Sequence, residues 1–177
     1  MGNWHRTGPS VNESRYPRSG SIPRAAPLPK ELPAASWQGQ DGRGNWPLRS
    51  YLELAALETA PSCARLHAKV RLAEWRLSTV IDDAELVVSE LVTNALLAPP
   101  ELEESPALIR LWLLGAASLL VVVVWDGSRQ PPQLARVPAM AENGRGMRII
   151  SELSTDWGWY AAASTGGKCV WAEFAIP

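Results

Sequence analysis

Seven consecutive apolar residues, from Leu119 to Trp125, most restrict how this chain can fold. Valines dominate the run, and their branched side chains favour the extended backbone of a β-strand. A strand without alternating polar residues is typical of the centre of a sheet, where both faces are buried. The run is too short to cross a bilayer as a helix, which needs about 20 apolar residues. The sequence therefore predicts a central strand at 118–125 that ends at Asp126-Gly127.

Three further strands are predicted around this one. An apolar segment at 107–114 precedes it, and Gly115-Ala116-Ala117 between the two segments predicts a hairpin. Strands at 155–162 and 168–176 flank Gly166-Gly167, which is a strong turn signal. The last strand alternates between one face with Val170, Ala172, Phe174 and Ile176 and another with Cys169, Trp171 and Glu173.

Helical patterns account for three other segments. A first helix is predicted from Pro61-Ser62 to about Trp75, with Ser62 as its N-cap. Its predicted apolar face consists of Leu66, Val70, Ala73 and Leu77. A second helix is predicted at 84–97, after a D-x-x-E capping pattern and before a Pro-Pro pair. The capping residues are Asp82 and Glu85, and the predicted core positions are Leu86, Val87, Leu91 and Ala95. A short third helix is predicted at 147–153, while residues 48–60 give only a weak signal for a strand or helix.

Helices and antiparallel strands are grouped along the chain rather than alternating one by one. This grouping favours an α+β fold, a two-layer sandwich with a mixed, mostly antiparallel sheet and helices on one face. We expect residues 48–177 to form this single domain. Residues 1–47 carry seven of the fifteen prolines and six of the thirteen glycines, which predicts a disordered tail. Six Lys/Arg against three Asp/Glu in that tail fit either a solvated segment or a docking arm.

Charge and cysteine content exclude several classes of function. A formal net charge of -1 creates no overall field that favours nucleic acid or an anionic membrane. Cys63 and Cys169 are far apart, match no metal-binding spacing and do not form a disulfide framework. The N-terminal residues contain no apolar run of the secretory type. We therefore expect a cytoplasmic protein without a direct nucleic-acid or membrane partner.

Two polar places interrupt the apolar segments and are candidates for chemistry. Glu90 and Asn94 are four residues apart, so they lie one turn apart on one helix face. A carboxylate there can act as a base, and an amide oxygen can bind Mg²⁺, although both residue types are also common on solvated helices. Asp126-Gly127 can accept a hydrogen bond from an exocyclic amine in a buried pocket, or can simply end the strand as a turn.

A third candidate is the glycine-rich segment that opens the predicted short helix. It reads Asn143-Gly144-Arg145-Gly146. Free amides at a helix N-terminus bind phosphate, and glycine lets the phosphate come close. A flexible loop that closes on a helix is an equally good interpretation of these residues.

The ordered set of motifs resembles a known superfamily. It reads S-E-L-V-T-N-A, then V-V-V-W-D-G-S, then N-G-R-G-M-R-I-I, then G-G-K-C-V-W-A-E-F. This order resembles the Bergerat-fold ATP-binding (GHKL) superfamily of gyrase and histidine kinases. Within it, the motifs are most similar to the anti-sigma factor serine kinases, in particular to small actinobacterial ATP-binding regulators. The resemblance extends from Ala64 to Phe174.

The resemblance implies a role for each motif residue. Asn94 would coordinate Mg²⁺, and Glu90 would be the general base. Asp126, followed by Gly127, would bind the adenine amine of ATP. The phosphate-binding residues implied by the resemblance are Gly144, Arg145, Gly146 and Met147. The implied cofactors are ATP and Mg²⁺, and the implied partners are a sigma factor, an anti-sigma antagonist protein, or both, with a homodimer as a common state of relatives.

Several residues depart from the pattern of that family. Leu96-Leu97-Ala98-Pro99 stand where a His or Arg usually follows the asparagine motif. Ser128 replaces a second glycine after the adenine aspartate, and Cys169 replaces a threonine expected beside the adenine. The segment 128–143, which is the expected ATP lid, contains few extra glycines.

Three functions follow as alternatives. The first is a serine/threonine kinase and anti-sigma factor, and the second is a regulator that binds partners without phosphoryl transfer. The third is a catalytic fragment of a histidine kinase, but His5 lies in the tail and His67 in the first helix, where a surface or core histidine is expected. Trp157, Trp159 and Trp171 on the last hairpin predict either an exposed interaction face or cross-strand packing.

Overall fold

The computed structural model describes residues 46–99, 107–132, 146–162 and 165–177 of the chain. Its helices are α1 (Ala60–Glu74), a short 3-10 helix η2 (Ser78–Val80), α2 (Ile81–Leu97) and α3 (Gly146–Leu153). Its strands are β1 (Leu48–Ala55), β2 (Leu108–Gly115), β3 (Leu119–Asp126), β4 (Asp156–Ala161) and β5 (Lys168–Ala175).

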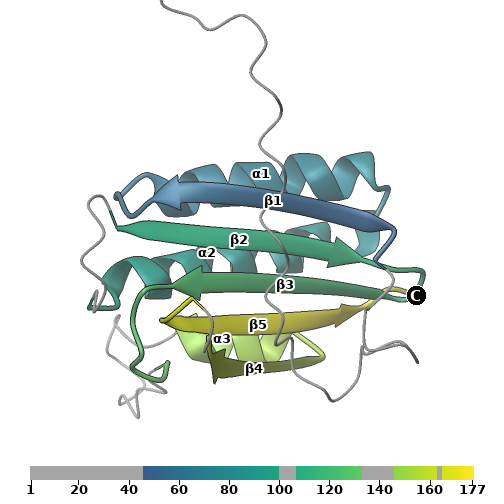
Figure 1. Ribbon diagram of the computed structural model, residues 1–177. Coiled ribbons are helices and arrows are strands. Elements are labelled where there is room, and N and C mark those ends of the chain that lie inside the picture. The colour runs from purple at the N-terminus through teal and green to yellow at the C-terminus, as the bar shows by residue number, and fades with distance from the viewer. Residues whose placement is uncertain (1–45, 100–106, 133–145, 163–164) are drawn as a thin grey trace, which may run out of the picture.

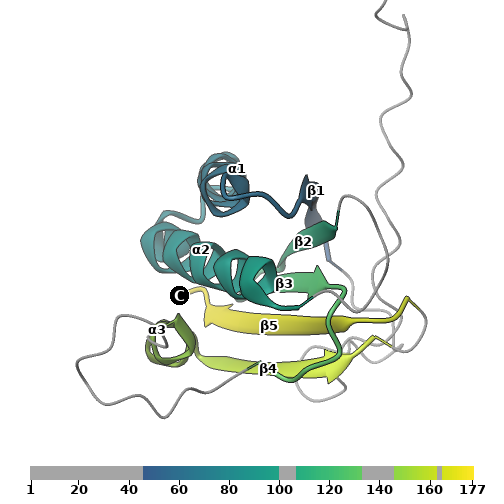
Figure 2. The same cartoon turned by 90° about the vertical axis from the view of Figure 1, so that its left-hand side faces the viewer.

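The five strands form one sheet in the order β1-β2-β3-β5-β4, and each of the four pairings is antiparallel (Figure 1). The apolar run occupies β3 in the middle of that order, as the sequence predicts. The three α-helices lie together on one face of the sheet (Figure 2). The α+β two-layer sandwich is therefore confirmed. We expected a mixed sheet, whereas all the pairings in the described part of the chain are antiparallel.

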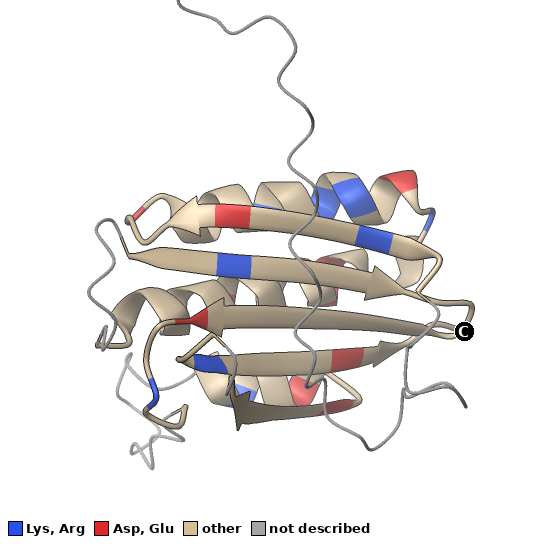
Figure 3. Cartoon of the chain, in the orientation of Figure 1, with Lys and Arg blue, Asp and Glu red and all other residues tan. Residues whose placement is uncertain are grey.

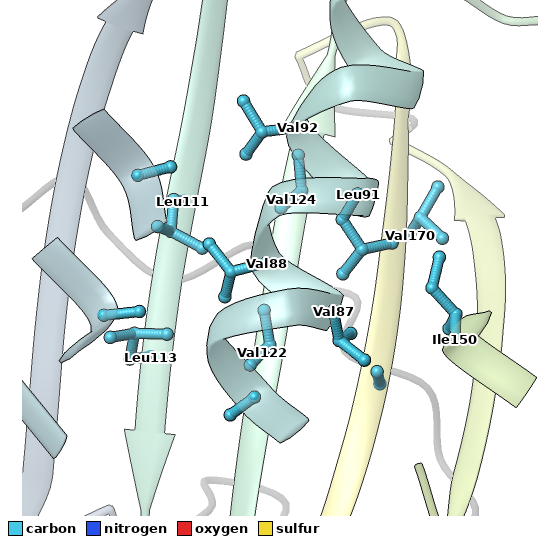
Figure 4. Packing of buried hydrophobic residues seen from close by; sticks show 14 of the residues in the cluster. Val87, Val88, Leu91, Val92, Leu111, Leu113, Val122, Val124, Ile150 and Val170 are labelled. Carbon is cyan, nitrogen blue, oxygen red and sulfur yellow. The ribbon is translucent and has the colours of Figure 1, made fainter. Parts of the chain in front are cut away.

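The main core lies between α2 and the three middle strands. Val87, Val88, Leu91 and Val92 of α2 point toward the sheet (Figure 4). They pack in one buried cluster with Leu111 and Leu113 of β2, Val122 and Val124 of β3, Val170 of β5 and Ile150 of α3. The alternation predicted for β5 is confirmed, because Val170, Ala172 and Phe174 belong to this cluster and Cys169 and Trp171 do not.

Helix α1 buries a different face from the one predicted. Its buried residues are Ala60, Ala64, Ala68 and Leu72, at a spacing of four. Leu66 and Val70, which we expected inside, are 62% and 46% exposed. The buried side chains of α1 belong to the same buried cluster as the core residues of α2, the helix that α1 contacts. Small side chains such as alanine allow two helices to pack closely. The N-cap is Thr59 rather than Ser62, and its side chain makes no capping hydrogen bond.

The two faces of α1 give a matched test of this packing. Leu72→Ala is expected to lower the free energy of unfolding by about 2–5 kcal/mol, because it leaves a cavity in the core. Leu66→Ala on the same helix is expected to change it by less than about 0.5 kcal/mol, since that side chain is exposed. Urea unfolding of both variants measures the difference. Equal losses would mean that the helix is rotated from the orientation described above.

Helix α2 begins three residues earlier than predicted, at Ile81. No capping box forms, because the N-cap is Val80 and no side chain caps the helix. Asp82 and Asp83 lie in the first turn, where carboxylates favour the positive end of the helix dipole. Leu86, a predicted core residue, is 39% exposed. The predicted end of the helix before Pro99 is confirmed.

Three further expectations concern the segment 48–60, the cysteines and the possibility of a membrane-spanning helix. The weak signal at 48–60 corresponds to strand β1, which ends at Ala55. Both cysteines are free thiols, Cys63 exposed and Cys169 buried. None of the described helices has both the length and the apolar character needed to cross a membrane.

The tryptophans of the last hairpin do not share one face. Trp171 pairs with Gly158, and a Cβ on that glycine would lie 2.7 Å from the indole ring, so the ring lies over the glycine. Trp157 packs against the core on the helical side of the sheet, and Trp159 is 41% exposed. Cross-strand packing therefore explains Trp171, and the single exposed face of tryptophans is not formed.

Candidate ATP-binding site

Helices α2 and α3 bring the predicted carboxylate, amide and glycine together. A Cβ built on Gly146, the first residue of α3, would lie 2.7 Å from Glu90 Oε2 and 3.4 Å from Asn94 Oδ1. The Asn94 amide group donates a hydrogen bond of 3.5 Å to Met147 Sδ, which directs its oxygen away from the sulfur. Only a glycine fits at this helix start without displacing the Glu90 carboxylate. The arrangement leaves backbone amides, an amide oxygen and a carboxylate around one small space.

The second part of the site is a buried ion pair at the end of β3. Lys168 Nζ donates to Asp126 Oδ1 at 2.8 Å, and the side chains of both residues are 5% exposed. Asp126 is the last residue of β3 and Lys168 is the first residue of β5, and the two are direct partners in the register of these strands. Figure 3 shows an acidic and a basic segment next to each other at this edge of the sheet. The Ser128 N–H donates to the same oxygen at 2.9 Å. Burial raises the pKa of the Asp126 carboxyl, while the Lys168 ammonium and the Ser128 N–H act against that rise.

The turn between β4 and β5 fixes the position of Lys168. Gly166 and Gly167 adopt positive φ values of 70° and 72°, which favour glycine. A Cβ on Gly167 would lie 2.0 Å from the Asp126 carbonyl oxygen, so the two backbones touch there. The Trp125 indole N–H donates to the Gly166 carbonyl at 2.8 Å. These contacts hold the turn against the end of β3 and place Lys168 directly opposite Asp126.

A pocket of about 180 Å³ opens beside Asp126. Its lining comes from the end of α2, the start of β2 and the end of β3, and it includes Ala95, Leu96, Ile109, Asp126, Gly127 and Ser128. At roughly 30 Å³ for each water in the liquid, this volume suits a ring system rather than a whole nucleotide. Ala95 lines the pocket and Asn94 faces Gly146, so the pocket and the start of α3 both border the C-terminal half of α2. A flat base in the pocket would therefore have its phosphates near α3.

The other predicted residues have the following places. Asn143, Gly144, Arg145 and most of the expected lid lie outside the described residues. Ser128 is buried, and its backbone N–H orients Asp126 while its Oγ accepts from the Gln130 N–H at 3.2 Å. The expectation that Cys169 stands beside the adenine is wrong, because Cys169 belongs to the cluster on the opposite face of the sheet. His67 lies half-buried against Ser50, with 2.8 Å between its Nε2 and the serine Oγ.

Lys168 is the site residue that sequence reasoning missed. A lysine at the start of a strand, directly after a Gly-Gly turn, has the pattern of a solvated residue. One signal for its position was present in the sequence. Lys168, Val170 and Ala172 are spaced by two residues, and residues two apart in a strand share a face. That parity places Lys168 on the helical side of the sheet, where Asp126 also lies.

Comparison with known families agrees with this geometry. The profile of the histidine kinase-like ATPase domain matches residues 54–174, which is well over half of the chain. The chain therefore belongs to the histidine kinase-like ATPase domain family. A comparison with curated proteins finds no match. Membership of this family implies an ATP-binding regulatory protein, with binding that typically includes Mg²⁺.

The residues present fit ATP and Mg²⁺. Both hydrogen bonds described for Asp126 reach Oδ1, which leaves Oδ2 to accept from the amine of adenine. Asn94 Oδ1 is an oxygen donor of the kind that Mg²⁺ prefers, and this ion usually completes its shell with substrate phosphates and water. Gly146 lets the start of α3 lie close to the Glu90 and Asn94 side chains, and the free N–H groups at a helix start are groups that bind phosphate.

Proposed function

We propose that this chain is an ATP-dependent serine/threonine protein kinase and anti-sigma factor whose substrate is a small antagonist protein. The observation that carries the proposal is the position of Glu90 Oε2, 2.7 Å from where a Cβ on Gly146 would stand. A carboxylate there adjoins the backbone that would hold the phosphates of ATP. It is therefore well placed for a hydroxyl that approaches the γ-phosphate.

In the proposed transfer, Glu90 accepts the proton of a serine or threonine hydroxyl of the antagonist. The hydroxyl oxygen forms a bond to the γ-phosphorus of ATP. The bond from that phosphorus to the β–γ bridging oxygen breaks, and ADP leaves with the electron pair. Asn94 would hold the Mg²⁺ whose charge offsets that of the phosphates, and Asp126 would fix the adenine.

The proposed partners follow from the motif resemblance rather than from a docking surface. They are a sigma factor, bound directly, and the phosphorylated antagonist, both in the cytoplasm. A homodimer is part of the same proposal. The net charge of -1 supports a protein partner over direct binding to nucleic acid or to a membrane.

Glu90→Gln is expected to reduce phosphoryl transfer about 10²–10⁴-fold, because it removes the proton acceptor. The assay incubates the protein with radiolabelled ATP, Mg²⁺ and candidate antagonist proteins. Glu85→Gln, on the same helix and facing Lys69 at 3.5 Å, is the matched control and should transfer phosphate normally. Transfer that survives Glu90→Gln at the wild-type rate would remove Glu90 from this role.

A second function, nucleotide-dependent partner binding without transfer, is favoured by one observation. No Lys, Arg or His occurs from Leu96 to Pro99, so this segment supplies no positive charge to offset the phosphates of ATP during transfer. Such a regulator would bind ATP and retain it unchanged. Separation of ATP from ADP after incubation with every candidate antagonist distinguishes the two functions. Tight binding without ADP formation would favour the regulator.

A further inference from the structure

The ion pair between Asp126 and Lys168 uses only one oxygen of the carboxylate. Lys168 Nζ and the Ser128 N–H both donate to Asp126 Oδ1, at 2.8 Å and 2.9 Å. Within the described part of the chain, no donor bonds to Oδ2. The carboxylate is therefore fixed through Oδ1, and Oδ2 is the oxygen that a ligand can reach.

Lys168 touches this carboxylate without touching the space where a base would lie. The lining of the pocket includes Asp126, Gly127 and Ser128. Among the described residues, the lining comes from α2, β2, β3 and the residues next to them, and none of it comes from β5. Lys168 therefore acts on a bound base only through Asp126, which makes it a positioning residue.

The protonation state of Asp126 decides what this carboxyl group can bind. An ionised carboxylate only accepts hydrogen bonds, whereas a protonated carboxyl group also donates one through its O–H. Burial raises the pKa of Asp126 and so favours the protonated form, and the Lys168 ammonium opposes that rise. Removal of the ammonium would therefore favour a carboxyl group that donates.

No second charge among the described residues competes with Lys168 at this place. Ile109 of β2 is the direct partner of Asp126 in the strand register. The residues of α2 that border the same pocket are Ala95 and Leu96. These side chains do not titrate, so the charge on Asp126 depends on Lys168 more than on any other described side chain.

We propose that Lys168 determines which purine the pocket accepts, because it keeps Asp126 in the ionised state that only accepts hydrogen bonds. Adenine presents an exocyclic amine, which donates to such a carboxylate. Hypoxanthine presents a carbonyl at the same ring position, and two acceptors that face each other in a buried site leave both without a donor. The inference rests on the adenine site within the proposed function, and it is independent of phosphoryl transfer.

The ratio of ATP affinity to inosine triphosphate affinity tests this role in the full chain. Both affinities are measured by calorimetric titration with Mg²⁺. Lys168→Met removes the ammonium and keeps an unbranched side chain. We expect the ratio to fall at least about tenfold at about pH 6.5, because a protonated Asp126 can donate to the hypoxanthine carbonyl. Lys69→Met removes an exposed lysine of α1 and is the matched control, with a ratio within about threefold of the wild type.

The pH dependence of this ratio distinguishes a role in selectivity from a merely structural one. Below the pKa of Asp126 the carboxyl group is protonated and selectivity is lost, and above it selectivity returns. We expect the pH of this change to be at least about one pH unit higher in Lys168→Met than in the wild type. The ratio cancels the titration of the phosphates, because both nucleotides carry them. Equal weakening of both nucleotides at every pH would overturn the proposal.

Asp126→Asn separates a failure of this inference from a failure of the adenine site. The amide oxygen can still accept from Lys168 and Ser128, while the amide nitrogen donates where Oδ2 accepted. We expect this variant to bind inosine triphosphate at least about tenfold more tightly than ATP, without dependence on pH. An unchanged ratio in Asp126→Asn, or a wild type that binds no ATP, would remove both the adenine site and the inference. A reversed ratio in Asp126→Asn with an unchanged ratio in Lys168→Met would remove only the role of Lys168.

Discussion

Asp126→Ala is expected to lower the free energy of unfolding by about 3–5 kcal/mol, one of the largest effects of any single substitution in this chain. The cause is the Lys168 ammonium, which lies 2.8 Å from Asp126 Oδ1 and would remain buried without a counter-charge. The Ser128 N–H would lose its acceptor as well. Urea unfolding measures the loss.

A second substitution separates this charge effect from a simple loss of packing. Lys168→Met in the Asp126→Ala background removes the uncompensated ammonium and should restore most of the lost stability, because an apolar replacement of a whole buried pair is often nearly neutral. Lys168→Met alone leaves Asp126 with the Ser128 N–H and should cost less than Asp126→Ala. A double variant no more stable than Asp126→Ala would show that the ion pair does not determine the loss.

Gly146→Val is expected to weaken binding of ATP with Mg²⁺ at least about 100-fold, which corresponds to about 2.7 kcal/mol. Its Cβ would stand 2.7 Å from Glu90 Oε2 and 3.4 Å from Asn94 Oδ1, so the branched side chain fills the space assigned to the phosphates. The fold should tolerate the change, because the nearest atom is the end of a flexible side chain. Calorimetric titration measures the affinity.

Ser151→Val is the control for this substitution, since Ser151 is an exposed residue of the same helix. It adds the same β-branched side chain to α3, with its small cost in helix propensity, but away from Glu90 and Asn94. ATP affinity should stay within about threefold of the wild type, because no group of the site is touched. An equal loss in both variants would assign the effect to the helix rather than to the phosphate site.

The sheet was largely predictable because its signals are local. The apolar run of β3, the Gly-Gly turn and the alternation of β5 each define a strand without knowledge of the rest of the chain. The end of the run also marks Asp126 as a polar residue at the edge of the core. Glu90 and Asn94 could be placed on one helix face by their spacing alone.

The features that could not be predicted depend on contacts between helices and strands that are separate in sequence. Helix α1 has two apolar stripes, and the larger side chains of Leu66 and Val70 favoured the wrong one. The alanine stripe is buried because small residues allow a close approach to α2, which no pattern within α1 reveals. Similarly, the Asp126–Lys168 pair joins two strands that are far apart in sequence, and only their register brings the charges together.

An adenine pocket at Asp126 is tested most directly by comparing ATP with inosine triphosphate in calorimetric titrations of the full chain with Mg²⁺. Inosine carries a carbonyl where adenine carries the amine that Asp126 Oδ2 would accept. We predict one ATP bound per chain and affinity for the inosine nucleotide at least about 100-fold lower, because the buried carboxylate would then face a second acceptor. Equal affinity for the two nucleotides, or no binding of ATP, would contradict an adenine site at this carboxylate.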